Sequence, residues 1–302
     1  MTAISSFAAL TSHLKGLNCR KRIAVANAVD SHTLQAVIQA VDAGIAEAYL
    51  FGDVAAIESP LLFEQNPSPY IHIIDVPEVQ AATLEAVRMV KQGEADVLMK
   101  GLVNTDVILK AVLDKETGLL PAGNILTYNA VLEIPKYHKL LFISDPAVIP
   151  SPNIEQRKAM IRYSIQTTYK FGIRKLKVAL IHALEKANPK IHYMQDYVEI
   201  MQCWRQGEFG DVIMDGPLDV FLALDRERGA IKHVSTPVLG DADIIIFPSF
   251  ESANSFYKGL MTFAGAEMGG LLQGTEKPVV LTSRGESIES KFYSIAMGCI
   301  LA

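Results

Sequence analysis

Residues 22–44 read RIAVANAVDSHTLQAVIQAVDAG and combine a strand pattern with a helix pattern. The apolar run 22–28 is typical of a buried strand. Residues 30–44 then carry apolar side chains at helical spacing, with an N-cap at Asp30 or Ser31 and a closing glycine. A buried strand followed by an amphipathic helix is the repeating unit of parallel α/β sheets, so this stretch predicts the fold class.

The same alternation continues along the chain. The expected fold is α/β with two domains, mostly parallel sheets and helices on both faces. We predict further strands at 48–51, 71–75, 96–101, 139–145, 176–184, 211–217, 243–248 and 277–285, helices at 79–93, 104–118, 154–172, 193–207 and 287–302, and a helix with a glycine-rich turn over 255–274.

A change of composition marks the expected domain boundary. Five prolines fall between residues 119 and 152, after a long regular alternation. We place the first domain at 1–121 plus 276–302, because the last helix is expected to return to it, and the second at 122–275. The length of 302 residues suits two domains of ordinary size.

Composition and charge exclude several classes of protein. The chain is 50% hydrophobic and 20% charged, which excludes disordered, collagen-like and coiled-coil proteins. Its net charge of -5 predicts no nucleic-acid or membrane partner, and an anionic ligand would need a local cationic pocket. The cysteines Cys19, Cys203 and Cys299 form no CxxC motif. With no signal-peptide pattern and no apolar run of about 18 residues, we expect a cytoplasmic protein.

The common nucleotide-binding and hydrolase motifs are absent. The sequence has no GxxxxGK[ST], no GxGxxG after the first strand, no HExxH and no GxSxG. Asp241 and Asp243 allow two interpretations, a metal-binding pair or the capped start of a strand, and the second is favoured. We therefore expect no P-loop, no Rossmann dinucleotide site and no metal at the two aspartates.

The first segment that could carry chemistry is residues 98–118. A strand ends at Lys100, and Asn104 or Thr105 begins the next helix. Ligands bind at the carboxyl ends of strands in open α/β sheets, and free N–H groups at a helix N-terminus favour an anion. The alternative is a capped helix with an ordinary surface lysine.

A second segment, 247–260, is expected to form a helix after a strand. Asn254 and Lys258 are four residues apart and share a helix face, and Tyr257 lies beside them. Both side chains could point into one cleft. The alternative is a solvated helix face.

A third segment, 278–291, ends an apolar strand in Thr282, Ser283 and Arg284. A glycine turn and another helix N-terminus follow. Arginine offers two parallel donors to a phosphate, and the helix dipole adds to the attraction. The alternative is a capping turn with a surface arginine.

Taken in order, these segments resemble the phosphate acetyl/butyryltransferase family, most closely its phosphate butyryltransferase branch. The resemblance implies the two-domain fold of isocitrate and isopropylmalate dehydrogenases, with the active site in the cleft between the domains. It covers nearly the whole chain and is strongest at MKGLVNTDVILKAVLDKETGL (99–119), MDGPLDV (214–220), GDADIIIFPSFESANSFYKGL (240–260) and PVVLTSRGESIESK (278–291).

The resemblance also implies a reaction, in which acyl-CoA and phosphate are converted reversibly to acyl phosphate and CoA. The resemblance implies direct transfer in a ternary complex, without a metal or redox cofactor. CoA is a substrate or product rather than a cofactor. The expected partners are acyl-CoA and inorganic phosphate, and the expected assembly is a homodimer or larger homo-oligomer. Butyryl or a similar short acyl chain is favoured.

The family's Ser-Arg pair matches Ser283 and Arg284, which are therefore the predicted catalytic residues. Arg284 is expected to hold phosphate, while Ser283 donates a hydrogen bond to the carbonyl oxygen or the thiolate. Thr105 and Lys258 are expected to complete the anion site. The remaining candidates for binding phosphate or CoA are Lys100, Asn104, Asn254 and Tyr257.

One departure from the family concerns the general base. Acetyltransferase members carry an acidic pair shortly after the Ser-Arg motif, and one acid is a candidate base toward the CoA thiol. The corresponding residues here are Glu289 and Ser290. Glu289 is the predicted base, and the second acid is missing.

Three other functions stay open. The first is a phosphate acetyltransferase. The second is a metal-dependent decarboxylating dehydrogenase of the same fold, which would need clustered aspartates and a nucleotide site that the sequence does not offer. The third is a catalytically silent CoA-binding protein, against which Ser283, Arg284 and Lys258 argue.

Overall fold

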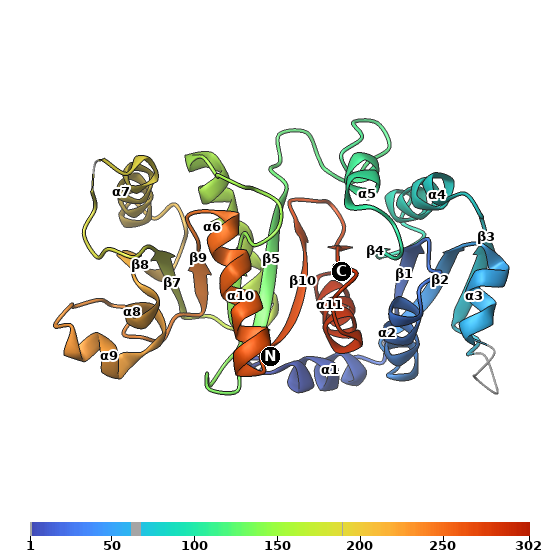
Figure 1. Cartoon of the computed structure of the whole chain (residues 1–302), viewed down its shortest axis with the longest axis horizontal. Coiled ribbons are helices and arrows are strands. Elements are labelled where there is room, and N and C mark those ends of the chain that lie inside the picture. The colour runs from blue at the N-terminus through green and yellow to red at the C-terminus, as the bar shows by residue number, and fades with distance from the viewer. Residues whose placement is uncertain (1, 62–67, 189) are drawn as a thin grey trace. The chain divides into compact units, whose positions relative to one another are not determined.

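The computed structural model describes residues 2–61, 68–188 and 190–302, and it divides into two compact units (Figure 1). Unit 1 comprises Met1–Ser6 and Thr127–Glu267, and unit 2 comprises Phe7–Leu126 and Met268–Ala302. Each unit has its own strands and its own helices. No helix among the described residues is long and apolar enough to cross a membrane.

Unit 2 is built on strands in the order β3–β2–β1–β4–β11–β10. The pairings are parallel except that of β10 with β11, which is antiparallel. The strands are β1 (Lys21–Ala26), β2 (Ala46–Gly52), β3 (Ile71–Asp75), β4 (Val97–Lys100), β10 (Glu267–Gln273) and β11 (Val279–Val280).

Helices cover both faces of this sheet (Figure 1). Strands β2 and β3 lie on one side of β1 in the sheet. The next strand along the chain, β4, lies on the other side of β1. The strand order therefore reverses between β1 and β4, the kind of point at which doubly wound sheets bind ligands. One face carries α2 (Ser31–Asp42), α3 (Val54–Leu61) and α11 (Ile288–Leu301), with α1 (Phe7–Gly16) packed on α11, and the other carries α4 (Val79–Lys91) and α5 (Thr105–Val112).

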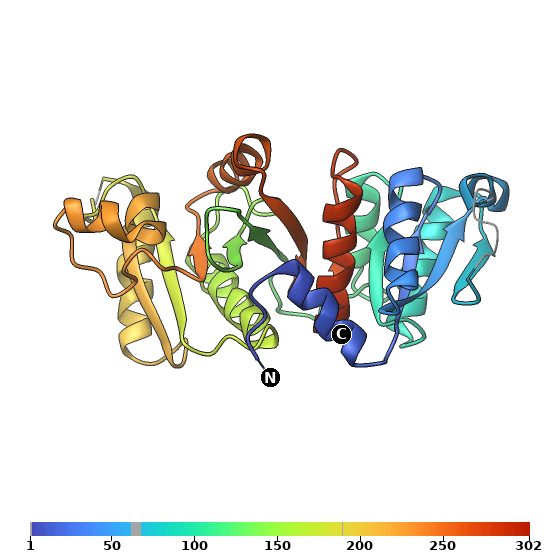
Figure 2. The same ribbon diagram turned by 90° about the horizontal axis from the view of Figure 1, so that it is seen from below.

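Unit 1 is built on strands in the order β5–β6–β9–β7–β8, in which only the β5–β6 pairing is antiparallel. Figure 2 shows α6 and α7 on one face of this sheet and α8, α9 and α10 on the other. The elements are β5 (Thr127–Glu133), β6 (Leu141–Ser144), β7 (Leu176–Ile181), β8 (Val212–Leu218), β9 (Ile244–Ile246), α6 (Ile154–Lys170), α7 (His192–Arg205), α8 (Val220–Leu224), α9 (Arg226–Ile231) and α10 (Phe250–Ala264).

The predicted α/β fold class is confirmed, with differences in single elements. The helix predicted at 104–118 ends at Val112, and the strand predicted at 277–285 covers only 279–280. The glycine-rich turn predicted within 255–274 was wrong, because residues 267–273 form β10. The structure also adds α1, α3, β5, α8 and α9, which the sequence patterns did not indicate.

Glycine in β10 serves helix packing instead of a turn. A Cβ on Gly269 would lie 2.9 Å from Met297 Sδ and 3.0 Å from the backbone carbon of Tyr293, both on α11. The missing side chain lets the helix approach the strand closely. This contact lies between distant segments, so the sequence pattern alone could not distinguish it from a turn.

The turn after β4 also depends on a glycine. Gly101 N–H donates to the carbonyl oxygen of Ala26 at 2.9 Å, and Asn27 Nδ2 donates to the carbonyl oxygen of Leu102 at 2.7 Å. A Cβ on Gly101 would lie 2.4 Å from the Asn27 carbonyl oxygen and 2.6 Å from that of Ala26. These bonds join the carboxyl ends of β1 and β4, and they place Lys100 at the point where the strand order reverses.

Gly101→Ala is therefore expected to lower the free energy of unfolding by about 2–3 kcal/mol, because backbone atoms must move to admit the methyl group. Urea denaturation followed by circular dichroism measures this change. The matched control is Gly259→Ala in α10, where a Cβ would meet no atom within 4 Å. Gly259→Ala is expected to raise the free energy of unfolding by about 0.5–1 kcal/mol. Equal stability of Gly101→Ala and the unmodified protein would contradict the packing argument.

Candidate functional site

The carboxyl ends of β1, β4 and β11 bring several predicted site residues together in unit 2. β11 pairs in parallel with β4, with Val279 opposite Leu98 and Val280 opposite Met99. Lys100, the next residue of β4, therefore lies beside the residues that follow β11. The two segments predicted from separate parts of the sequence thus meet at one edge of the sheet.

Arg284 and Asn104 make the direct contact between these segments. Arg284 Nη2 donates a short hydrogen bond to Asn104 Oδ1, across 180 residues of sequence. Asn104 occupies the N-cap of α5, yet its side chain makes no hydrogen bond to the first turn of that helix, which begins at Thr105. The N–H groups of this first turn are left without a side-chain cap, which favours an anion. Arg284 is exposed, and its other donors are open to a ligand.

Lys100 adds a buried positive charge to the same place. Its exposed fraction is 4%. Burial lowers the pKa of Lys100, and the nearby charges of Lys291 and Arg284 lower it further, while Asp30 and Glu286 partly oppose them. These residues come from β4, α2, α11 and the turn before α11, so the site is assembled from most of the unit's central elements.

Lys291 is a residue that the sequence analysis missed. Its side chain is buried, and Nζ donates to the carbonyl oxygen of Ser283 at 3.1 Å and to Thr282 Oγ1 at 3.3 Å. Burial lowers the pKa of Lys291. One sequence signal could have identified it. A lysine near the N-terminus of a helix interacts unfavourably with the helix dipole, so its presence there indicates another role.

The turn that carries Ser283 and Arg284 is also held by acceptors from the start of α11. Glu286 Oε1 accepts the N–H of Ser283 at 3.0 Å. Ser287 is the N-cap of α11, and its hydroxyl oxygen accepts the N–H of Ser290 at 3.1 Å. Ser290 is thus part of the helix start. Glu289, the predicted base, is exposed in the first turn of α11.

The other predicted residues belong to unit 1 and lie on α10. Asn254 Nδ2 donates to the carbonyl oxygen of Pro146 at 3.0 Å, so its amide is engaged with a loop. Tyr257 is buried and Lys258 is exposed. The predicted helix is present, and substrate contacts for these residues stay a prediction.

The start of β9 favours the strand interpretation of the two aspartates considered for metal binding. Lys139 Nζ lies 2.9 Å from Asp241 Oδ1 and 2.6 Å from Asp243 Oδ1. Lys177 Nζ lies 2.9 Å from Asp241 Oδ2, and its backbone N–H donates to Asp243 Oδ2. Both carboxylates are therefore engaged by lysines of unit 1.

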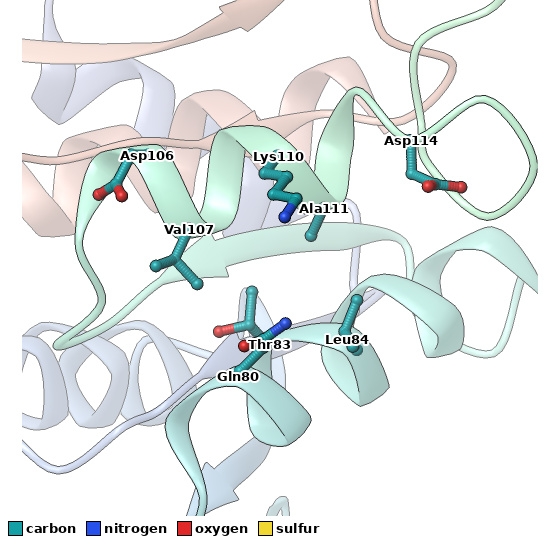
Figure 3. A pocket seen from close by; sticks show the side chains of 8 residues that line it. All are labelled: Gln80, Thr83, Leu84, Asp106, Val107, Lys110, Ala111 and Asp114. Carbon is teal, nitrogen blue, oxygen red and sulfur yellow. The ribbon is translucent and has the colours of Figure 1, made fainter.

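Each unit also has a pocket that none of the predicted site residues lines. Figure 3 shows the pocket between α4 and α5, of about 380 Å³, in which Lys110 points from α5 toward Gln80 and Thr83 of α4. Aspartates 106 and 114 line it too, so its charge is mixed. The second, of about 740 Å³, lies in unit 1 and is mostly apolar. It is lined in part by Tyr193, Phe221, Phe247 and Phe256.

The chain is similar to known proteins over most of its length. Residues 74–299 match the family described as phosphate acetyl/butaryl transferase. Over 282 residues, the chain is 39% identical to a phosphate butyryltransferase of Clostridium acetobutylicum, covering 93% of each chain. It is 37% identical to a phosphate acetyltransferase of Thermotoga maritima over 286 residues, covering 93% of this chain and 95% of the relative.

Solved structures agree on the fold. A branched-chain phosphotransacylase from Enterococcus faecalis aligns with a TM-score of 0.80 at 29% identity, covering 93% of this chain and 98% of that one. A 4-hydroxythreonine-4-phosphate dehydrogenase from Klebsiella pneumoniae aligns with a TM-score of 0.60 at 11% identity, covering 93% and 100%. The second likeness concerns the fold alone, and it shows that a dehydrogenase has the same fold.

Proposed function

Since this chain belongs to the phosphate acetyl/butaryl transferase family, we propose that it converts a short-chain acyl-CoA and phosphate reversibly to acyl phosphate and CoA. It is a phosphate acyltransferase, as its relatives are, and the residue roles and the acyl chain are our assignments. The observation that carries them is the contact of Arg284 with Asn104 at the start of α5, beside buried Lys100. This concentrates positive charge in a chain whose net charge is -5.

The arrangement suits an in-line attack of phosphate on a thioester. The guanidinium of Arg284 and the uncapped start of α5 at Thr105 hold the phosphate, and orientation lowers the barrier to attack. A phosphate oxygen forms a bond to the carbonyl carbon, and the hydroxyl of Ser283 donates to the developing oxyanion. The C–S bond then breaks, and its electron pair leaves with the CoA sulfur. This step balances without a metal ion or redox cofactor.

Glu289 is proposed as the base that takes the thiol proton of CoA in the acyl-CoA-forming direction. Glu289→Gln is expected to lower kcat in that direction by about 10²-fold, since the amide cannot accept the proton. The measurement is acyl-CoA formation from acyl phosphate and CoA, with the exposed Glu94→Gln as control. Normal turnover of Glu289→Gln would remove the assignment.

We propose butyryl-CoA as the preferred thioester, supported by the named phosphate butyryltransferases at 39% and 37% identity. The test is phosphate-dependent CoA release, followed with a thiol reagent, from acetyl-, propionyl-, butyryl- and isobutyryl-CoA after dialysis against EDTA. We expect the highest kcat/KM for butyryl-CoA. A preference for acetyl-CoA would favour a phosphate acetyltransferase. Loss of activity on dialysis would overturn the metal-free step, and no release from any thioester would overturn the function.

We further propose that the protein works in the cytoplasm as a homodimer or larger homo-oligomer. Large apolar side chains at the ends of two helices of unit 1 support an interface, since Phe263 is 90% exposed and Ile231 is 75% exposed. Light scattering coupled to gel filtration tests the assembly. A monomeric mass at the assay concentration would contradict it.

A further inference from the structure

Lys291 is a buried cation attached to the turn that carries Ser283 and Arg284. Its exposed fraction is 2%, and its ammonium group donates to the carbonyl oxygen of Ser283 and to Thr282 Oγ1. Both acceptors are uncharged. The side chain therefore supports the turn by hydrogen bonds, and these bonds leave its positive charge without compensation.

The surroundings of Lys291 compensate that charge only in part. Lys100, also buried, lies near enough for the charge of Lys291 to act on it. Within the described ranges, neither ammonium group forms an ion pair with a carboxylate. The charges of Asp30 and Glu286 raise the pKa of both lysines without forming ion pairs with them. Both carboxylates also accept a backbone N–H, which comes from Thr33 for Asp30 and from Ser283 for Glu286.

Two buried ammonium groups without carboxylate partners, next to Arg284, are unfavourable for the folded protein on their own. An anion bound among them removes the penalty. The three cations face only two carboxylates, both more distant, so the site keeps a net positive charge. This excess attracts an anion such as phosphate.

We propose that Lys291 is a positioning residue of the phosphate site, which orients the Ser283–Arg284 turn and, with Lys100, supplies buried charge that the bound dianion compensates. This inference rests on the proposed function, because it concerns the same site. It predicts that Lys291 favours phosphate binding while it disfavours the ligand-free fold. A lysine with a purely structural role would favour both.

The charge balance makes phosphate binding sensitive to pH. Burial lowers the pKa of Lys291. Burial also lowers the pKa of Lys100, and the positive charges of Lys291 and Arg284 lower it further. The charges of Asp30 and Glu286 oppose both shifts. A bound dianion raises both pKa values again. Between the free and the bound pKa values, binding takes up a proton, so phosphate affinity is expected to fall as pH rises through this interval.

The test is calorimetric titration of the full chain with inorganic phosphate at about pH 7.5 and about pH 9.5, together with thermal unfolding with and without phosphate. Lys291→Met is expected to weaken phosphate binding at the lower pH at least tenfold and to reduce the loss of affinity at the higher pH. Its Tm without ligand is expected to be no lower than that of the unmodified protein. In turnover, KM for phosphate is expected to rise more than KM for acyl-CoA. The control, Lys110→Met in the α4–α5 pocket, is expected to change none of these values.

Two further variants separate charge from hydrogen bonding. Lys291→Gln keeps a donor and loses the charge, so it is expected to bind phosphate as weakly as Lys291→Met. Lys291→Arg keeps both and is expected to recover most of the affinity. Wild-type phosphate affinity in Lys291→Gln would overturn the inference, even if Lys291→Met failed to fold. Because phosphate binding needs no turnover, an unmodified protein that binds phosphate but releases no CoA would overturn only the acyl transfer.

Discussion

Arg284→Ala is expected to lower kcat/KM for phosphate by about 10³-fold, with a higher KM for phosphate and a lower kcat. Among the predicted site residues of unit 2, Arg284 is the exposed cation that contacts the start of α5. It does so through its hydrogen bond to Asn104. Its loss removes the parallel donors that orient the phosphate for attack, so both ground-state binding and the transition state suffer. Initial rates over a matrix of phosphate and acyl-CoA concentrations measure this effect.

Two variants make the result specific to Arg284. Arg284→Lys keeps the charge and loses the planar fork, so an intermediate loss of activity is expected. Arg205→Ala removes an exposed arginine at the end of α7 and is expected to leave the kinetics unchanged. If Arg284→Ala kept both the wild-type KM and kcat, phosphate would have to bind elsewhere.

Lys100→Met is expected to have opposite effects on activity and stability. Activity is expected to fall by about 10²-fold, because a buried positive charge beside the phosphate site is lost. Stability at neutral pH is expected to stay equal or rise, because burial and the charges of Lys291 and Arg284 disfavour the protonated form in the folded protein. Rates and urea denaturation on the same preparation measure the two effects.

The pH dependence of stability gives a second check on Lys100. Its pKa in the folded protein is lower than in the unfolded chain. Between these two pKa values the unfolded state binds more protons, so the contribution of Lys100 to the free energy of unfolding rises with pH there. Lys100→Met is expected to lack this rise, whereas Lys110→Met is expected to keep it. A Lys100→Met variant that lost stability at neutral pH and kept full activity would contradict both predictions.

Local structure explains which features the sequence alone could predict. Asp30 caps α2 as expected, with its carboxylate accepting the N–H of Thr33, and Ser287 caps α11. Such signals work because capping groups and the apolar residues behind them lie within a few positions of one another. β1 and β4 were predicted for the same reason, since each is a short apolar run next to a clear helix start.

Local patterns along the chain were therefore enough to predict the α/β class, the strand end at Lys100 and the family resemblance of the motifs. The folded structure was needed to show three further features. Arg284 contacts Asn104, the charge of buried Lys291 acts on buried Lys100, and the glycines of 267–273 belong to a strand. Spacing along a chain sets which face of an element a residue occupies. The neighbours that residue meets depend on strand order and helix packing, which join segments far apart in sequence.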